Sequence, residues 1–179
     1  MAGSRAEAYI SAMTGTPPAV TVSLLTRMLV EAFEGPPGPW TYFTDTSPGT
    51  GVFGTLSGLS AADASRKGGP GHTTIAGHVH HLTSSLALST RGLRGESTSR
   101  DRSGSWTVSA VDDAEWAALR ARLHDEYATL FVAVETHARW DEDALAVAIG
   151  AIAHTAYHLG AIRQRLPARR RGSARAIKG

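Results

Sequence analysis

Apolar residues recur every three or four positions through much of the chain, which is the spacing that places side chains on one face of an α-helix. Residues 21–35, TVSLLTRMLVEAFEG, carry such a stripe, and Gly35 is placed to end a helix in the left-handed conformation. The stripe predicts that five residues of this helix face a core: Leu24, Leu25, Met28, Leu29 and Phe33.

A second helix is predicted over about 74–91, where another apolar stripe follows a polar, glycine-rich segment. A threonine, Thr73 or Thr74, is suited to cap its first turn, and Gly92 follows its expected end. The residues of the stripe are Ile75, Val79, Leu82 and Leu86.

A third helix of about 25 residues is predicted from apolar positions that keep the helical spacing without interruption. Asp112 precedes Glu115 by three residues at its start, which resembles a capping box. The residues expected to face the core are Trp116, Leu119, Leu123, Tyr127, Leu130, Val134 and His137.

The last helix is predicted from Asp141 to about Arg165. Three acidic residues open it, and negative charge is favourable at a helix N-terminus. Residues 144–162 contain no Asp, Glu, Lys or Arg, so this helix is apolar nearly all round. We therefore expect it to be buried on most sides.

The segments between these helices, at 35–51, 67–72 and 92–109, are rich in glycine, proline and serine and are expected to form loops. Residues 52–62 are expected to form one short helix. The chain shows no internal repeat and no strand pattern. The sequence therefore predicts an all-α four-helix bundle with extra short helices and long loops.

The length of 179 residues suits one domain with a substantial core. We expect a flexible N-terminus at 1–19, a helical domain at 20–166 and a basic, disordered tail at 167–179. Five of the 18 basic residues lie in this tail, which leaves 13 basic against 16 acidic residues in the rest of the chain. A solvated, disordered end is favoured over nucleic-acid binding by the tail.

The chain has no cysteine, which excludes disulfides, thiolate nucleophiles and zinc–thiolate sites. Any metal ion must therefore be bound by nitrogen or oxygen. The N-terminal segment has no apolar run long enough for a signal peptide, so a cytoplasmic location is expected by default. Arginine outnumbers lysine 16 to 2, a bias typical of a GC-rich bacterial genome.

Two histidines, His154 and His158, interrupt the apolar last helix. Because they are four residues apart, both can aim a ring nitrogen at one metal ion, as in the HExxH helices of zinc enzymes. Two core histidines, each hydrogen-bonded to a carbonyl, are the alternative for this pair alone. A transmembrane helix is a further alternative, but the two histidines and the amphipathic character of the preceding helices argue against it.

A second group of histidines lies on the predicted helix 74–91. His78 and His81 border its apolar stripe, so either can face the gap between helices and supply a third ligand. Three histidines with an open position are typical of a catalytic metal site. His80 is expected to be solvated, and the other three are expected to be surface or packing residues: His72, His124 and His137.

The motifs GHVHHL and AHTAYHLGAIRQ, taken together, resemble the DinB/YfiT-like superfamily of metal-binding four-helix bundles over about residues 20–166. The resemblance implies that His81 is a metal ligand together with His154 and His158. His78 stays an alternative ligand from its place on the helix, and the family pattern does not require it. Many members carry Gln three residues after the last histidine, where this chain has Ala161. This departure leaves the activity open.

The resemblance also implies a divalent transition metal, which can be nickel, zinc, iron or manganese. Characterised members use low-molecular-weight bacterial thiols such as mycothiol or bacillithiol, so the resemblance implies activation of such a thiol for S-transfer in detoxification. A metal-dependent hydrolase that activates water and a non-enzymatic bundle with structural or no metal are the rivals, and whether the chain is an enzyme is left open. The expected partners are a small-molecule substrate and, because members are often dimers, a second copy of the chain. Neither a membrane nor a nucleic acid is expected.

Residues near these histidines are candidates to orient the imidazoles or to cover the site. Ser85, Thr155 and Tyr157 are close to them in sequence, and Glu126 or Glu135 of the third helix can serve the same purpose. The candidates to cover the site come from the aromatic loop 35–51 and are Trp40, Tyr42 and Phe43.

Overall fold

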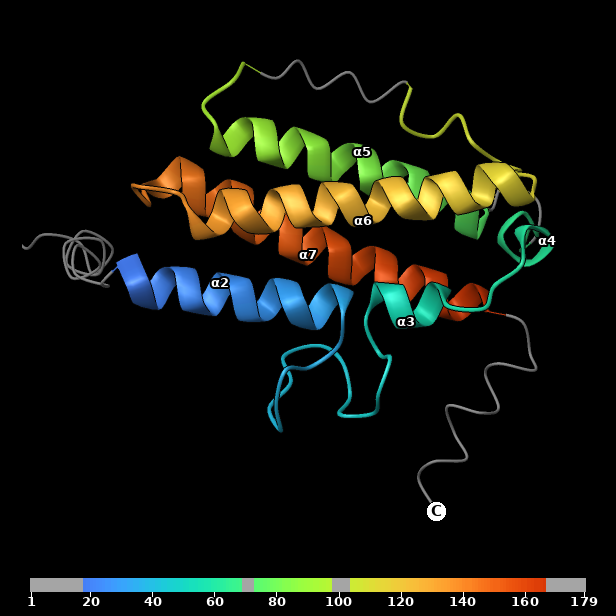
Figure 1. The fold of residues 1–179 in the computed structure, drawn as a ribbon, viewed down its shortest axis with the longest axis horizontal. Coiled ribbons are helices and arrows are strands. Elements are labelled where there is room, and N and C mark those ends of the chain that lie inside the picture. Colours follow the sequence, from blue (N-terminus) through green and yellow to red (C-terminus); the bar gives the residue numbers. More distant parts are fainter. Residues whose placement is uncertain (1–17, 69–72, 98–103, 167–179) are drawn as a thin grey trace, which may run out of the picture.

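The computed structural model describes residues 18–68, 73–97 and 104–166 (Figure 1). These residues form helices and loops, and no strand occurs among them. The helices are α2 Pro18–Phe33, α3 Val52–Leu56, α4 Ala61–Ala64, α5 Ile75–Leu93, α6 Asp113–Glu135 and α7 Glu142–Arg165. The predicted all-α fold is therefore confirmed, whereas the expected tail at 167–179 lies outside the described residues.

The four long helices form a bundle in which each one packs against two others. α5 contacts α6 and α7, and α2 contacts the same two helices. α5 and α6 run in one direction, and α2 and α7 run in the opposite one (Figure 1). The connection between α5 and α6 must therefore return along the bundle, and it carries Ser105 back to the side of α5.

Side-chain caps fix where the three longest helices begin. Thr74 accepts the Gly77 N–H at the start of α5, as one of the two predicted alternatives. Asp112 and Glu115 form the predicted capping box at the start of α6. Asp141 accepts the Ala144 N–H at the start of α7. Each cap satisfies a backbone N–H that has no partner within its helix and stabilises the helix by about 1 kcal/mol.

Glycines end or interrupt the helices, although not always where the sequence predicts. Gly35 follows α2 with a φ of 110°, as expected. The expected short helix 52–62 is wrong, because the chain turns at Gly58, with a φ of 65°, and separates α3 from α4. Gly92 does not follow α5 but lies within it, and the left-handed residue after this helix is Gly95.

The core lies where the predicted stripes of α2, α5 and α6 meet each other and α7. Most of the stripe residues are buried as expected. Met28, Leu119 and His137 are only partly buried, and Leu24 is exposed over 43% of its surface. The largest fully buried apolar side chains are Phe33, Leu29, Ile75, Leu82, Leu86, Leu123, Leu130, Ile162, Val52 and Val79.

The expected burial of α7 on most sides is wrong. The helix packs on α5 and α2, but its outer face stays open, with Ile149 56% and Tyr157 68% exposed. Within the described ranges α7 is the one helix long and apolar enough to cross a membrane, a test that the core helix of a soluble protein also passes. The absence of charged residues did not reveal this face, because individual apolar side chains, large ones included, are commonly exposed on protein surfaces.

The loop after α2 is held by the buried carboxylate of Glu31. This group accepts hydrogen bonds of 2.8–2.9 Å from the backbone N–H groups of Tyr42, Phe43 and Thr44 and from the Thr44 hydroxyl. Burial raises the pKa of Glu31, but these hydrogen bonds outweigh it and bring the pKa below its ordinary value. Glu31 therefore carries its charge inside the protein and fixes the fold of this loop.

Candidate metal centre

Two neighbouring helices bring four histidines together in the interior of the bundle. His78 and His81 lie one turn apart on α5, and His154 and His158 lie one turn apart on α7. Because α5 and α7 pack against each other, the two pairs face one another. The residues predicted as ligands, His81, His154 and His158, each offer one ring nitrogen, and these atoms all lie within 4.8 Å of one another.

The Nε2 atoms of these three histidines converge on one point. His154 Nε2 lies 2.9 Å from His158 Nε2 and 3.2 Å from His81 Nε2. Transition-metal–nitrogen bonds are about 2.0–2.1 Å long, so two imidazoles that bind one ion have nitrogens about 3 Å apart. The spacing in this cluster is therefore that of a three-histidine metal site.

His78 lies behind the convergent nitrogens. Its Nδ1 is 2.9 Å from the Nδ1 of His158, on the side of that ring that faces away from His154. Its own Nε2 is buried and has no hydrogen-bond partner among the described residues. The structure thus places His78 beside a predicted ligand rather than at the point where the three Nε2 atoms meet.

Burial keeps the inner imidazoles neutral. Loss of solvent, followed by the charges of His154, His78 and His81, lowers the pKa of His158 to about 3. Loss of solvent, followed by the charges of Arg165 and His81, lowers the pKa of His78 to about 4. A metal ligand must offer a free lone pair, so a neutral His158 is in the state that an ion requires.

The connection between α5 and α6 covers the cluster. The His81 Nδ1 is 2.9 Å from the Ser105 hydroxyl, and the Trp106 indole stacks on the His81 ring. This close approach requires Gly77, where an added Cβ would stand 2.9 Å from the Val108 carbonyl oxygen. Sequence reasoning missed both Ser105 and Trp106. The unused signal was a tryptophan within an otherwise polar connection.

The loop expected to cover the site has a different role. Tyr42 and Phe43 are anchored to Glu31 through their backbone, and Trp40 is 78% exposed. Among the described aromatic residues, Trp106 is the ring that contacts His78 as well as His81 and His158, at centroid distances of 4.1–5.8 Å.

The other residues expected to orient the imidazoles differ in what they contact. The hydroxyls of Ser85 and Thr155 donate to backbone carbonyls one turn earlier. The Tyr157 ring meets His158 edge to face but is mostly exposed. Glu126 lies 4.0 Å from Arg122, and Glu135 is exposed near the end of α6.

The remaining histidines lie apart from the convergent nitrogens. His80, expected to be solvated, is instead partly buried, with its Nδ1 3.1 Å from the Ser105 carbonyl oxygen. His124 is exposed and stacks on Phe53, while His72 lies outside the described residues. His137 packs against Trp140, as a packing residue is expected to do.

A hollow of about 870 Å³ opens directly beside His81 and His154. Small residues of α5 and α7, such as Ser85 and Gly150, line it, and Trp106 borders it. Two cations, Arg91 and Arg122, complete its wall, and no carboxylate is among its lining residues in the described part of the chain. A small molecule can therefore reach the histidines from this side.

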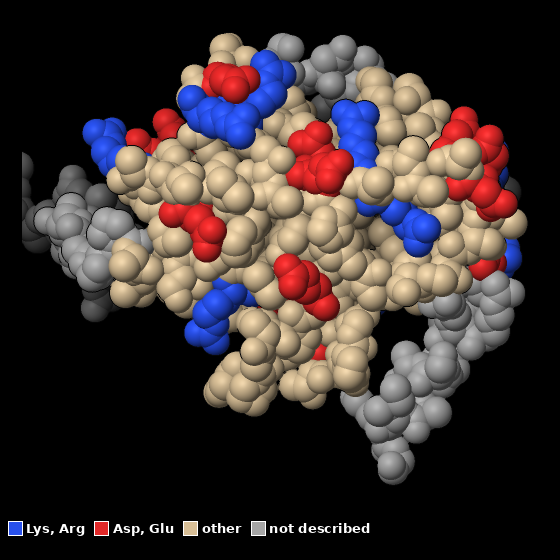
Figure 2. All heavy atoms as spheres, viewed as in Figure 1, with Lys and Arg blue, Asp and Glu red and all other residues tan. Residues whose placement is uncertain are grey.

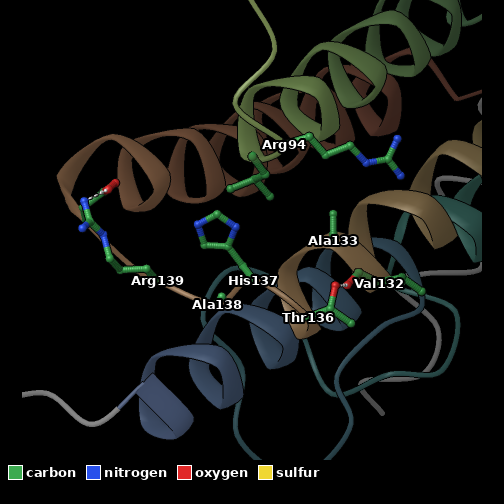
Figure 3. A pocket seen from close by; sticks show the side chains of 9 residues that line it. Arg94, Val132, Ala133, Thr136, His137, Ala138 and Arg139 are labelled. Carbon is green, nitrogen blue, oxygen red and sulfur yellow. Dashed lines mark hydrogen bonds and ion pairs between the residues drawn. The ribbon is translucent and has the colours of Figure 1, made fainter.

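A second hollow, of about 460 Å³, lies at the end of α6 and is lined by His137, Arg94 and Arg139 (Figure 3). Arg139 is engaged by Asp141 at 3.1 Å. Its metal-ligating groups are the His137 imidazole and the carboxylate of Asp141, which pairs with Arg139. Among the described residues, the one group of three that could hold a metal ion is His81, His154 and His158, so the four-histidine cluster remains the candidate centre.

A comparison of the chain with known protein families finds a match. A family model described as the DinB superfamily matches residues 51–162, which span both histidine pairs and more than half of the chain. No curated protein matches the chain, and no solved structure does.

Proposed function

The chain belongs to the DinB superfamily, and on that premise we propose that it binds one divalent transition-metal ion through His81, His154 and His158. The observation that carries the proposal is the convergence of three Nε2 atoms from two helices. Nickel, zinc, iron and manganese are the candidate ions, and imidazole nitrogens suit the first three of these best. The adjacent hollow supports a catalytic rather than a structural ion, because structural sites are closed by four protein ligands.

We further propose that the protein transfers a low-molecular-weight thiol of the mycothiol or bacillithiol type to an electrophile in detoxification. An ion held by three neutral imidazoles keeps its full charge and, when bound, lowers the pKa of a thiol or water molecule. The chain has no cysteine, so a sulfur nucleophile has to come from such a thiol. His81 and His154 border the hollow in which this molecule would lie, and the Trp106 indole lines one side of it.

Hydrolysis is the second candidate, since the same ion can activate water. In zinc hydrolases with an HExxH helix, a glutamate serves as general base beside the bound water. The hollow offers no Asp or Glu among its lining residues in the described ranges, which favours the thiol reaction. Glu126 lies 4.0 Å from Arg122, and Glu96 lies 2.8 Å from Arg91, so each pairs with an arginine that lines the hollow and is a candidate for that role in the hydrolase alternative.

The exposed side chains bear on which partners the protein can bind. The exposed apolar side chains of α7, Ile149 and Tyr157, support the proposed homodimer. Acidic and basic side chains are interspersed on the face drawn in Figure 2, which gives no support to a nucleic-acid partner on that face. A cytoplasmic location stays a prediction.

Elemental analysis of tag-free protein tests the metal site first. We expect one equivalent of metal after incubation with nickel or zinc, and its loss in His154→Ala and in His81→Ala. His124→Ala is the matched control, because it removes an exposed imidazole that lies on α6, whereas the cluster lies on α5 and α7. A parent protein that stays metal-free contradicts the proposal.

Thiol transfer is tested on the metal-loaded protein. Electrophile consumption is measured with and without added mycothiol or bacillithiol, and ester or amide hydrolysis is measured in parallel. Turnover that requires both metal and thiol supports S-transfer. Metal-dependent turnover without a thiol supports the hydrolase instead.

A further inference from the structure

His78 and His158 face each other through the same ring atom from two different helices. Their Nδ1 atoms are 2.9 Å apart, and 5% of His78 and 1% of His158 are exposed. At this distance one Nδ1 carries a proton and donates it while the other accepts. The contact therefore determines which nitrogen of His158 is protonated.

The two arrangements have opposite consequences for a metal ion. If His158 donates from Nδ1, its Nε2 holds a free lone pair that points at His154. If His78 donates, the neutral His158 ring must carry its proton on Nε2, where an ion has to bind. Only the first arrangement is compatible with the proposed ligand set.

We propose that His78 is a positioning residue that accepts the Nδ1–H of His158 and so holds His158 in the tautomer whose Nε2 faces the metal. This inference rests on the proposed metal site, to which it assigns a fourth histidine that is not a ligand. His78 then carries its own proton on Nε2, the buried atom that has no partner among the described residues. Trp106, whose ring stands at 81° to that of His78, packs against it and restrains its orientation.

A second ligand is held in the same way, which supports this assignment. The Nδ1 of His81 is 2.9 Å from the Ser105 hydroxyl, while its Nε2 faces His154. Metal-binding histidines generally donate the outer N–H to an acceptor, and removal of that acceptor typically lowers metal affinity about 10–100-fold. His78 and Ser105 thus have equivalent places behind two different imidazoles.

Two substitutions of His78 distinguish its role as a hydrogen-bond acceptor from its role in filling space. His78→Asn places an amide oxygen as many bonds from Cα as the Nδ1 that it replaces, so it keeps an acceptor for His158. His78→Leu fills a similar volume and has no acceptor. Zinc dissociation constants, measured by competition with a chelator, are expected to rise about 10–100-fold in His78→Leu and to stay near the parent value in His78→Asn. Circular dichroism shows whether both variants keep the helical fold.

The tautomer is measured directly in the metal-free protein, by long-range ¹H–¹⁵N NMR with His158 assigned from a His158→Gln spectrum. We expect the proton on Nδ1. A proton on Nε2, or equal zinc affinity in the parent and His78→Leu, or equal loss in both variants, overturns the role of His78. If the parent binds no metal but His158 carries its proton on Nδ1, the proposed metal site fails while the His78–His158 hydrogen bond is upheld.

Discussion

Trp106 stacks on the imidazole of His81, with ring centroids 4.1 Å apart and ring planes inclined by 13°. The two rings come from α5 and from the connection that follows it, and Trp106 also borders the hollow beside the cluster. The stack therefore links the position of the connection to the orientation of a proposed ligand. It also places an indole within reach of any ion that the histidines bind.

This contact makes Trp106 a reporter of metal binding. We expect nickel to quench part of the tryptophan fluorescence, because a paramagnetic ion quenches a nearby indole efficiently. Trp106→Phe keeps an aromatic ring on His81 but is expected to remove most of the nickel-dependent quenching. Trp40→Phe is the control, since Trp40 is exposed and is not among the rings that contact the histidines. Equal quenching in Trp106→Phe and the parent would place the ion elsewhere.

Glu31 is expected to make stability depend on pH. Its pKa is lower in the folded protein than the ordinary 4.5, so its stabilisation is complete above that value and is lost as pH falls through the lowered folded value. Glu31→Gln replaces the charged acceptor of these backbone N–H groups with a neutral amide. We expect it to lower the free energy of unfolding by about 2–3 kcal/mol at pH 7. The difference between parent and variant should shrink below pH 4.5.

Urea unfolding at a series of pH values measures this difference. Glu135→Gln, at an exposed position, serves as the control and should show a small effect at every pH. A difference between the parent and Glu31→Gln that is the same at pH 7 and pH 3 would mean that charge is not the source of the stabilisation.

The features that sequence predicts well are those determined by neighbouring residues. The Asp112–Glu115 capping box and the core stripe of α5 follow from spacing within a few turns, and both are confirmed. The approach of His81 to His154 was predicted through family resemblance, since spacing alone left two candidates for the third ligand.

Contacts between segments distant in the chain were missed. Nothing periodic marks Ser105 or Trp106, and their place depends on the path by which the connection returns past Gly77. The open face of α7 was missed because a pattern of apolar residues does not say which of them meet a neighbouring helix. The tautomeric role of His78 depends on a distance between two helices, and no spacing within one helix contains it.

Asp112 should account for a measurable share of the stability of α6. Asp112→Ala removes the acceptor for the Glu115 N–H and is expected to lower the free energy of unfolding by about 1 kcal/mol. Asp112→Ser keeps a capping oxygen and should stay near the parent. Chemical denaturation of the three proteins tests this order, and equal stability of the Ala and Ser variants would show that the cap contributes little.

Gly150 allows a test of the hollow that leaves the histidines intact. It lies on α7 one turn before His154 and lines the hollow. A Cβ added at this position would have no neighbouring atom within 4 Å among the described residues. Gly150→Leu should therefore fill part of the hollow without straining the backbone. Replacing a helical glycine should also stabilise α7 by up to about 1 kcal/mol.

Gly160→Leu is the matched control, because Gly160 lies on the same helix, has the same open space and is not among the residues that line the hollow. Both variants should bind one equivalent of metal. Thiol binding, followed by thiolate-to-metal charge-transfer absorption in the cobalt-loaded protein, should weaken at least about tenfold in Gly150→Leu alone, since a filled pocket loses about 1.4 kcal/mol or more of ligand binding. If both variants bind the thiol as the parent does, the thiol reaches the ion by a route other than this hollow.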